Sequence, residues 1–211
     1  MTQYTARYII ITMDEKSNVK QTIMNKALEL FSAKGYEGVP VSELTEASGI
    51  TKPALYYYFK SKEGLFDAVC KMYYGRLNEK ITENALYNPN PKNYDKDIIF
   101  TLINVVNAYF SFAKSSENFY RITLSNLSMP SSSAVFKIAE KYHFTQYEII
   151  DGMFRNMAKA HGNLKGKSKI FTWSFLGTIN ACISLYFSGY GQLNDKTAKE
   201  LTHHFMHGIF A

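Results

Sequence analysis

Apolar residues recur at helical spacing through almost the whole chain. Val19, Ile23, Ala27, Leu30 and Phe31 follow one another at intervals of three or four, which places them on one face of a helix. No run that alternates apolar and polar residues reaches the length of a strand followed by a hairpin turn. The pattern therefore predicts an all-α protein.

Caps and helix breakers divide this pattern into about nine helices. Ser17 or Asn18 can cap the first, and Gly35 is placed to end it. Gly49 breaks the second helix, Thr51 caps the third and Ser61 caps the fourth. The helices after the first are expected at residues 41–48, 52–59, 62–85, 95–115, 117–128, 133–160, 168–188 and 196–210.

The same signals suggest two domains. We expect an N-terminal tail at 1–17, floppy or strand-like, then a three-helix domain at 18–66 and a larger helical bundle at 67–211. The helical signals begin only after Met13, so Met13 is an alternative natural start and the first 12 residues are left open.

Charge and cysteine content narrow the function classes. The net charge of +6 and pI near 9.1 fit an anionic partner. The excess is not on the small domain, because residues 1–66 hold eight Lys/Arg against seven Asp/Glu, but Lys52, Lys60 and Lys62 form a local basic run. Cys70 and Cys182 are far apart and no secretory signal precedes them, which favours the cytoplasm.

The uncharged segment 171–194 is long enough to cross a bilayer. Its many Ser, Thr and Asn residues and its closing glycines instead favour a helix buried in a bundle core or a subunit interface. We therefore expect no membrane partner.

Residues 41–62 carry the most specific pattern, two short helices joined by a tight turn. Gly49 suits a turn that needs a positive φ, and Pro53 fits the first turn of the following helix, where no N–H is needed. Leu44, Ile50, Leu55 and Phe59 can form a small core between the helices. The outward positions are then Lys52, Ala54, Tyr56 and Tyr57. Such a pair places its second helix in the major groove of DNA.

The stretch 19–69 resembles the DNA-binding domain of the TetR family of transcriptional regulators. The resemblance rests on an ordered set of residues: Ala27, Leu30, Phe31, Gly35, Tyr36, Leu44, Ala47, Gly49, Ile50, Lys52, Leu55, Tyr56, Tyr58, Phe59, Lys62, Glu63 and Leu65. Two positions depart from the family pattern. Thr45 stands where a small alanine is usual, and Pro40 stands where a Ser or Thr cap is common.

The resemblance implies a DNA contact set with separate roles. It implies that Tyr56, Tyr58 and Lys62 contact phosphates, that Lys52, Pro53, Ala54 and Tyr57 lie against base edges, and that Ser42 reaches DNA from the second helix. Thr51 and Lys60 complete the candidate set. The implied partner is double-stranded DNA with a palindromic operator, bound by a homodimer.

The larger domain holds most of the aromatic residues, and an apolar pocket with a few polar groups is how proteins bind small organic molecules. The resemblance implies a small effector, apolar or aromatic, that releases the repressor from DNA. The candidate effector residues are Phe112, Phe119, Tyr147, Asp151, Trp173 and Asn180. Dimerisation is expected on helices 168–188 and 196–210, where Gly177, Ala181 and Ser184 allow close approach.

Metal and enzyme chemistry have weaker signals. The loop at 162–168 resembles a phosphate-binding loop but has one residue too few between its glycines, and no strand precedes it, so a basic inter-helix loop is the better interpretation. His203 and His207 lie one helical turn apart without an acid or cysteine to complete a metal site. We expect no cofactor, no metal and no enzymatic activity. The alternative is a helical enzyme or interaction protein that uses the aromatic cavity and has a vestigial DNA motif. The effector, the operator, the regulated genes, and whether the effector releases or recruits the protein stay open.

Overall fold

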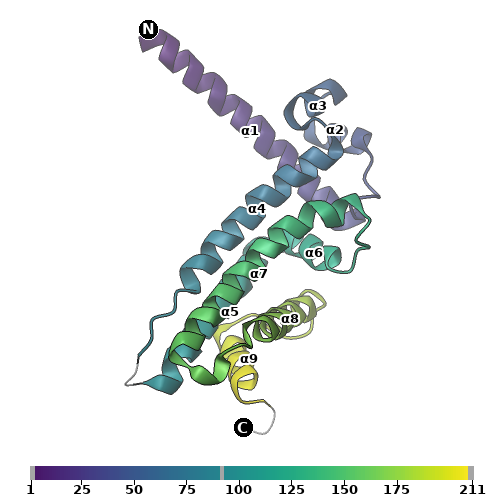
Figure 1. Cartoon of the computed structure of the whole chain (residues 1–211). Helices are drawn as coiled ribbons and strands as arrows, with labels where there is room; N and C mark the ends of the chain where they lie inside the picture. Colours follow the sequence, from purple (N-terminus) through teal and green to yellow (C-terminus); the bar gives the residue numbers. More distant parts are fainter. Residues whose placement is uncertain (1–2, 91–92, 209–211) are drawn as a thin grey trace.

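The computed structural model describes residues 3–90 and 93–208, and over these ranges the chain forms nine α-helices, one 3-10 turn and no strand (Figure 1). The predicted all-α class is confirmed. The helices are α1 (Gln3–Lys34), α2 (Val41–Ser48), α3 (Lys52–Phe59), α4 (Lys62–Asn84), α5 (Tyr94–Ser115), α6 (Glu117–Asn126), α7 (Ala134–Ala160), α8 (Ser168–Phe187) and α9 (Asp195–His207), with η1 (Gly162–Leu164) between α7 and α8.

The predicted N-terminal tail is wrong, because α1 already begins at Gln3 and runs for 32 residues. Neither glycine nor proline occurs in the first 34 residues, so nothing in the chain breaks the helix. Asn18 does not cap it. Its carbonyl oxygen instead accepts a hydrogen bond from the Thr22 hydroxyl at 2.9 Å, as expected inside a helix. The N-terminal part of α1 projects away from the rest of the molecule (Figure 1).

The later helix boundaries agree with the sequence to within about three residues. Gly35 and Gly49 follow α1 and α2 with positive φ angles of 72° and 64°, the left-handed conformation that glycine adopts without steric cost. The last helix was expected to reach residue 210. It ends at His207, and residues 209–211 lie outside the described part of the chain.

Helix α4 connects the two halves of the molecule. It starts directly after α3, packs against α1, and continues along α5 and α7 toward the end where α8 and α9 lie (Figure 1). The boundary predicted near residue 66 therefore falls inside a continuous helix. The division into domains at 18–66 and 67–211 stays a prediction.

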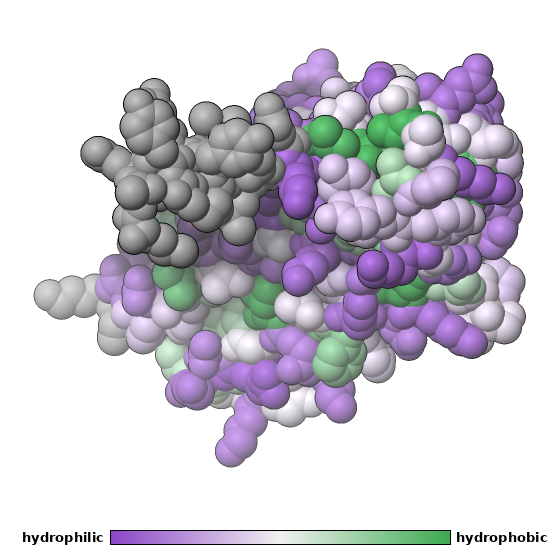
Figure 2. Space-filling view, turned by 90° about the horizontal axis from the view of Figure 1, so that it is seen from above, coloured by the Kyte–Doolittle hydropathy of each residue, from purple (hydrophilic) through white to green (hydrophobic). Residues whose placement is uncertain are grey.

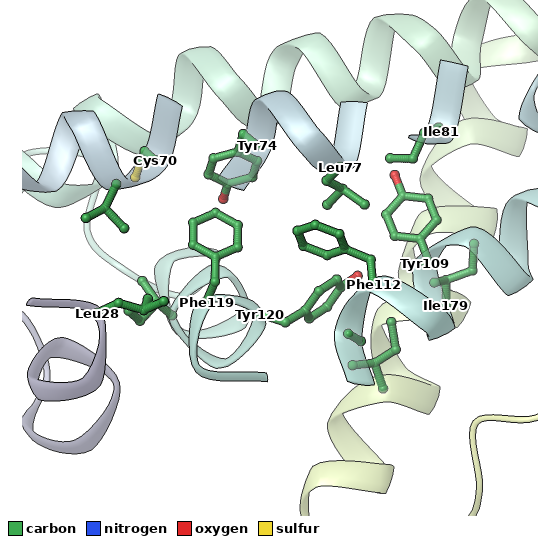
Figure 3. Packing of buried hydrophobic residues seen from close by; sticks show 14 of the residues in the cluster. Leu28, Cys70, Tyr74, Leu77, Ile81, Tyr109, Phe112, Phe119, Tyr120 and Ile179 are labelled. Carbon is green, nitrogen blue, oxygen red and sulfur yellow. The ribbon is translucent and has the colours of Figure 1, made fainter. Parts of the chain in front are cut away.

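The core of the larger half is built on one face of α4. Tyr74, Leu77 and Ile81 are fully buried and point toward aromatic residues of α5 and α6, among them Phe112 and Phe119 (Figure 3). Phe119 stands edge-on to Tyr74, with ring centroids 4.8 Å apart. These aromatic contacts lock α4 against the bundle.

Two helices are long and apolar enough to cross a membrane by length and composition, one within α5 and one matching α8. Over the tested windows, 56% of the α5 segment but only 22% of the α8 segment is buried. Helix α8 was expected to be buried on all sides or to form a subunit interface. Within a single chain it buries one face, through Thr172, Phe175, Ile179 and Ile183, and exposes the other.

Candidate nucleic-acid interface

Helices α2 and α3, predicted to bind DNA and called the reader below, are held together by the small apolar core that the sequence predicts. Leu44 of α2 and Leu55 of α3 have no exposed surface, Phe59 is 5% exposed, and Ile50 in the turn is half-buried. In the turn itself, the N–H of Ile50 donates to the Thr45 carbonyl oxygen at 3.0 Å. This packing orients α3 as a rigid unit with one face toward solvent.

Helix α3 begins and ends where its capping residues predict. The Thr51 hydroxyl accepts from the N–H of Ala54 at 3.4 Å, and Pro53 lies in the first turn. The Ser61 hydroxyl then caps α4 by accepting from the N–H of Gly64 at 3.0 Å. Glu63 follows in the first turn of α4, where hydrogen bonds from its own backbone N–H and from Ser61 lower the pKa of its carboxyl.

The outward face of α3 carries most of the residues predicted to contact DNA. Tyr57 is 63% exposed and Tyr56 is 41% exposed, beside exposed Lys52 and Pro53, while Ala54 is half-buried. No hydrogen bond to Tyr56 or Tyr57 is needed to hold α3 in place, because the buried face fixes the helix. At this end of the molecule the surface is mainly hydrophilic, with apolar residues in separate patches (Figure 2).

Tyr58 differs from its two neighbours. It is half-buried and packs against the core, with its ring 5.2 Å from that of Tyr57 and 6.2 Å from that of Phe59. Of the three consecutive tyrosines, two are therefore exposed and one forms part of the packing. Phosphate contact by Tyr58 stays a prediction.

Lys60, directly after α3, has an unusual backbone. Among the described non-glycine residues it alone has a positive φ, with φ 68° and ψ −38°. A side chain at positive φ strains the backbone, and the fold provides no apolar contact in return, because Lys60 is exposed. The conformation directs a cation to the surface beside α3.

Lys62 is engaged inside the protein. Its Nζ donates to the main-chain carbonyl oxygen of Tyr36 at 2.6 Å and lies 4.1 Å from the centroid of the Tyr36 ring. The resemblance implied a phosphate contact from this residue. The structure gives it a second role, tying the start of α4 to the segment that leaves α1.

The remaining predicted contact lies on α2. Ser42 is exposed, and its carbonyl oxygen accepts from the Thr45 hydroxyl at 2.8 Å. Thr45, which departs from the family pattern, is thus accommodated by a local hydrogen bond. Pro40 precedes α2 without any side-chain cap, as its ring requires.

The reader is coupled to the bundle by a polar contact that sequence reasoning missed. Asp67 of α4 lies 2.6 Å from Lys141 Nζ and accepts from the Tyr142 hydroxyl at 2.9 Å, both on α7. The hydrogen bond from Lys141 raises the pKa of its own ammonium group. The sequence could have indicated this contact only as an acidic residue on one helix and a basic residue on another. Pairing them requires knowing that α4 and α7 are neighbours.

The six predicted effector residues are not brought together in one pocket. Phe112 and Phe119 are buried in the core beside α4 (Figure 3), and Asn180 of α8 accepts from the buried Tyr120 hydroxyl at 2.7 Å. These three belong to one interior region. Their role in effector binding stays a prediction.

The other three lie on α7 and α8 and differ in burial. Trp173 is 59% exposed and stands 6.4 Å, centroid to centroid, from the half-buried Tyr147 of α7. Asp151 is buried and forms an ion pair with Arg155 at 3.2 Å. Trp173 shares its exposed surface of α8 with the residues predicted for dimerisation.

Gly177, Ala181 and Ser184 are all exposed on α8. A Cβ added at Gly177 would meet no atom within 4 Å, so this face is open in the single chain. The neighbouring exposed residues Trp173 and Leu185 are apolar, at 59% and 54% exposure. The face is uncharged, which is the chemistry of an interface between subunits.

A buried polar network lies at the other end of the bundle, and sequence reasoning did not find it. His161, 3% exposed, has its Nε2 2.8 Å from the Tyr87 hydroxyl and 3.1 Å from an Asp97 carboxylate oxygen. Asp97 also accepts from the Tyr87 hydroxyl and the N–H groups of Asn90 and Ile98, and hydrogen bonds of this kind hold its pKa below the usual value despite burial. His161 is 74 residues from Tyr87 and 64 from Asp97 in the chain, so no local motif marks the network.

The described residues contain no cluster of three or more His, Cys, Asp or Glu side chains that could hold a metal ion. His203 and His207 do approach each other, with ring centroids 4.8 Å apart. Both cysteines are free, Cys70 in the core and Cys182 half-buried.

Comparison with known proteins relates the DNA-reading segment to a known family. Residues 23–69 match the sequence profile of the bacterial regulatory proteins of the tetR family. The biofilm operon icaADBC HTH-type negative transcriptional regulator IcaR of Staphylococcus aureus is 32% identical over 85 residues, 40% of this chain and 44% of IcaR. The HTH-type transcriptional repressor AcnR of Corynebacterium efficiens is 34% identical over 92 residues, 41% of this chain and 49% of AcnR. The chain thus spans about half the length of these relatives.

Solved structures extend the likeness to the whole fold. FadR from Bacillus subtilis, a transcriptional regulator in complex with stearoyl-CoA, superimposes with a TM-score of 0.74 over 90% of this chain and 98% of its own, at 19% identity. AibR, in complex with isovaleryl coenzyme A and operator DNA, gives a TM-score of 0.67 over 91% of this chain and 100% of its own, also at 19% identity. At this level of identity the likeness concerns the fold.

Proposed function

Because residues 23–69 match the sequence profile of the tetR family of bacterial regulatory proteins, we propose that this protein is a cytoplasmic transcriptional repressor that binds operator DNA as a homodimer. The observation that carries the proposal is the solvent face of α3. A short capped helix, held by Leu44, Leu55 and Phe59, presents Lys52 and Tyr57 outward, and the surrounding residues do not cover them. This is the arrangement by which a helix enters the major groove.

The homodimer supplies the second reader. The uncharged face of α8 exposes apolar side chains, which a second copy of the protein would cover. A two-fold axis through this face would pair identical surfaces. Two readers then need half-sites on one side of the duplex, about 34 Å apart or a multiple of that distance. The operator is therefore expected to be palindromic or nearly so.

Control by a small molecule is the third part of the proposal. Two proteins of the same fold were solved with acyl thioesters of coenzyme A, which makes this class the first to screen here. An effector that binds the bundle can act on the reader through α7, whose Lys141 and Tyr142 hold Asp67 at the start of α4. A bound state that shifts α7 would tilt α4 and move α3 away from its groove.

The test is fluorescence anisotropy of the purified protein on labelled duplexes that tile the DNA upstream of its own gene. Random duplex serves as the reference, and two salt concentrations separate phosphate contacts from sequence reading. Binding to one tile well above random, with the tile containing an inverted repeat, is the expected result. Equal binding to every tile and to random duplex would contradict a sequence-specific repressor.

An enzyme is the second candidate, but no observation on the described residues favours it. The buried Asp97–His161 pair is satisfied by Tyr87 and backbone donors, and it has the character of a structural network. Turnover of a bound compound by the purified protein would overturn this assignment.

A further inference from the structure

The loop between α7 and α8 lies between two hollows of different character. The first, called the apolar hollow, has a volume of about 270 Å³ and is lined mainly by apolar side chains, with Lys167 among the rest. The second, called the basic hollow, has a volume of about 610 Å³ and has three basic side chains in its lining. Leu164 of η1 lines both. The two hollows are therefore adjacent, and a single small molecule can occupy both.

The apolar hollow is walled by aromatic residues from three helices. Phe154 of α7, Phe171 of α8 and Phe205 of α9 surround it, with ring centroids 5.8 to 6.3 Å apart. Ile98 and Met206 add further apolar surface. Its volume lies just below the range of pockets that hold drug-sized ligands, about 300–1,000 Å³, so it suits a small apolar group.

The basic hollow differs from the apolar one by its positive charge. Arg155, Lys159 and Lys165 line it, and no acidic residue does. Ser168, at its edge, begins α8 without a side-chain cap, so the first N–H groups of that helix add positive potential there. Three cations and a helix start around one hollow form a site for an anion with several oxygens, such as a phosphate group.

Two buried acidic groups lie near the hollows. Arg155 Nε lies 3.2 Å from Asp151 Oδ2, while Asp151 Oδ1 is buried without a hydrogen-bond partner among the described residues. Asp97 is bonded to His161, which lines the apolar hollow, and also accepts from the Tyr87 hydroxyl and from two backbone N–H groups. The lysines lie on the loop side, Lys159 and Lys165 in the basic hollow and Lys167 at the apolar one, so they draw a ligand's anionic end toward the loop.

From this geometry we infer that the two hollows form one binding site for an amphipathic phosphate. The apolar group lies among Phe154, Phe171 and Phe205, and the phosphate lies on Lys159, Lys165 and Arg155. The loop at 162–168, whose glycines and lysines resemble a phosphate-binding loop without matching its spacing, has a ligand-binding role after all. That this ligand is the effector rests on the proposed function; the existence of the site does not.

The test is isothermal titration calorimetry of the full-length protein with isovaleryl-CoA as the probe. This compound joins a short branched acyl group to a carrier with phosphates. Coenzyme A lacks the acyl group and isovalerate lacks the phosphates, so each occupies one hollow only. We expect isovaleryl-CoA to bind at least about tenfold more tightly than either, and its affinity to fall with salt.

Variants separate the two parts of the site. The double substitution Lys159→Gln with Lys165→Gln should weaken isovaleryl-CoA binding about tenfold and remove most of its salt dependence. Leu164→Asp, which places a carboxylate between the hollows, should weaken it further. Lys137→Gln, an exposed lysine at the other end of α7, is the matched control and should change nothing. Circular dichroism checks that each variant is folded.

Two results would overturn the inference: no binding of isovaleryl-CoA, or equal binding by the wild type and the folded Lys159→Gln, Lys165→Gln variant. The proposed function is tested separately by DNA anisotropy without ligand. Specific probe binding by a protein that does not bind DNA would support the site and contradict the repressor, so the two failures are distinguishable.

Discussion

The ammonium group of Lys62 donates a hydrogen bond to the main-chain carbonyl oxygen of Tyr36 and lies over the Tyr36 ring. This contact joins the first residue of α4 to the segment between α1 and α2. The start of α4 and the end of α1 are thereby held together by one side chain as well as by the apolar core.

Lys62→Met tests this contact. Methionine keeps the aliphatic length but loses the hydrogen bond and the cation–π contact, so the free energy of unfolding should fall by about 1–2 kcal/mol in urea denaturation. Lys71→Met, an exposed lysine on the same helix, is the control and should change stability by less than about 0.5 kcal/mol. Unchanged stability in Lys62→Met would mean that the contact is incidental. An unchanged salt slope of DNA binding would remove Lys62 from the phosphate contacts.

Lys60→Gly should move stability and DNA binding in opposite directions. Glycine relieves the strain of a positive φ, so the free energy of unfolding should rise by about 0.5–1 kcal/mol. Loss of one phosphate contact should weaken binding to all sequences and lower the salt slope by about 0.9.

Lys60→Asn is the companion variant, because asparagine tolerates positive φ better than lysine but carries no charge. It should weaken DNA binding as the glycine variant does. If both variants bind DNA like the wild type at every salt concentration, Lys60 contacts no phosphate.

Tyr57 and Leu55 lie on opposite faces of α3. Substituting each in turn should therefore separate effects on DNA recognition from effects on folding. Tyr57→Ala removes an exposed ring, so stability should stay within about 0.5 kcal/mol of the wild type. Binding to the operator should weaken more than binding to random duplex, since a base-edge contact is lost. Leu55→Ala should instead lower the free energy of unfolding by about 2–5 kcal/mol, because the side chain is fully buried. An equal loss for operator and random DNA in Tyr57→Ala would assign Tyr57 to the phosphates.

Stability should fall as pH is lowered from about 6.5 toward 4, because of His143 on α7. Burial against Tyr74 lowers the pKa of this imidazole to about 4, so it stays neutral in the folded protein while the unfolded chain takes up a proton. Proton uptake by the unfolded state stabilises that state, so between pH 7.5 and 5 the His143 contribution should cost about 2 kcal/mol.

Urea denaturation at the two pH values measures this, with His143→Gln as the comparison. Glutamine can still bond the Tyr74 hydroxyl but does not titrate, so the variant should lose about 2 kcal/mol less than the wild type over the same interval. Parallel pH profiles in the two proteins would show that His143 is not the group responsible.

Ala181→Arg should prevent dimerisation. Ala181 is exposed on the uncharged face of α8, so the substitution does not disturb its own chain, but two copies would meet across a two-fold axis with like charges. Sedimentation velocity should give a monomer, and operator affinity should fall with it. Ala134→Arg at the exposed start of α7 is the control and should remain dimeric. A dimeric Ala181→Arg protein would place the interface elsewhere.

The reader could be predicted almost residue by residue, because its chemistry is local. Helix ends are set by residues that act within a few positions of themselves, here Gly49, Thr51, Pro53 and Ser61. The predicted start of α1 was wrong, because a local capping signal does not show whether the chain before it is already helical. Ser17 and Asn18 are competent caps, but a cap residue begins a helix only when the preceding chain is not already helical.

The effector residues could not be located in the same way. Whether Trp173 faces the core or solvent depends on how α8 rotates against α7, and apolar residues occur on both faces of that helix. The hollow beside Phe154 and Phe205 combines helices α7, α8 and α9, whose arrangement no local pattern contains. The sequence indicated only the basic loop beside this hollow. Without knowledge of the hollow, the loop gave no reason to predict a binding site.

Helix α4 begins at the reader and ends at the far end of the bundle, over 23 residues or about 34 Å (Figure 1). Gly75 lies near the middle of this helix, yet the backbone stays helical through it, so the helix can act as a lever between the bundle and the reader. A tilt of about 5° about one end of the helix would carry the other end through about 3 Å, more than half of one helical turn. The sensitivity of such a switch is set by the stiffness of this one helix, and an interior glycine contributes less to that stiffness than any other residue except proline.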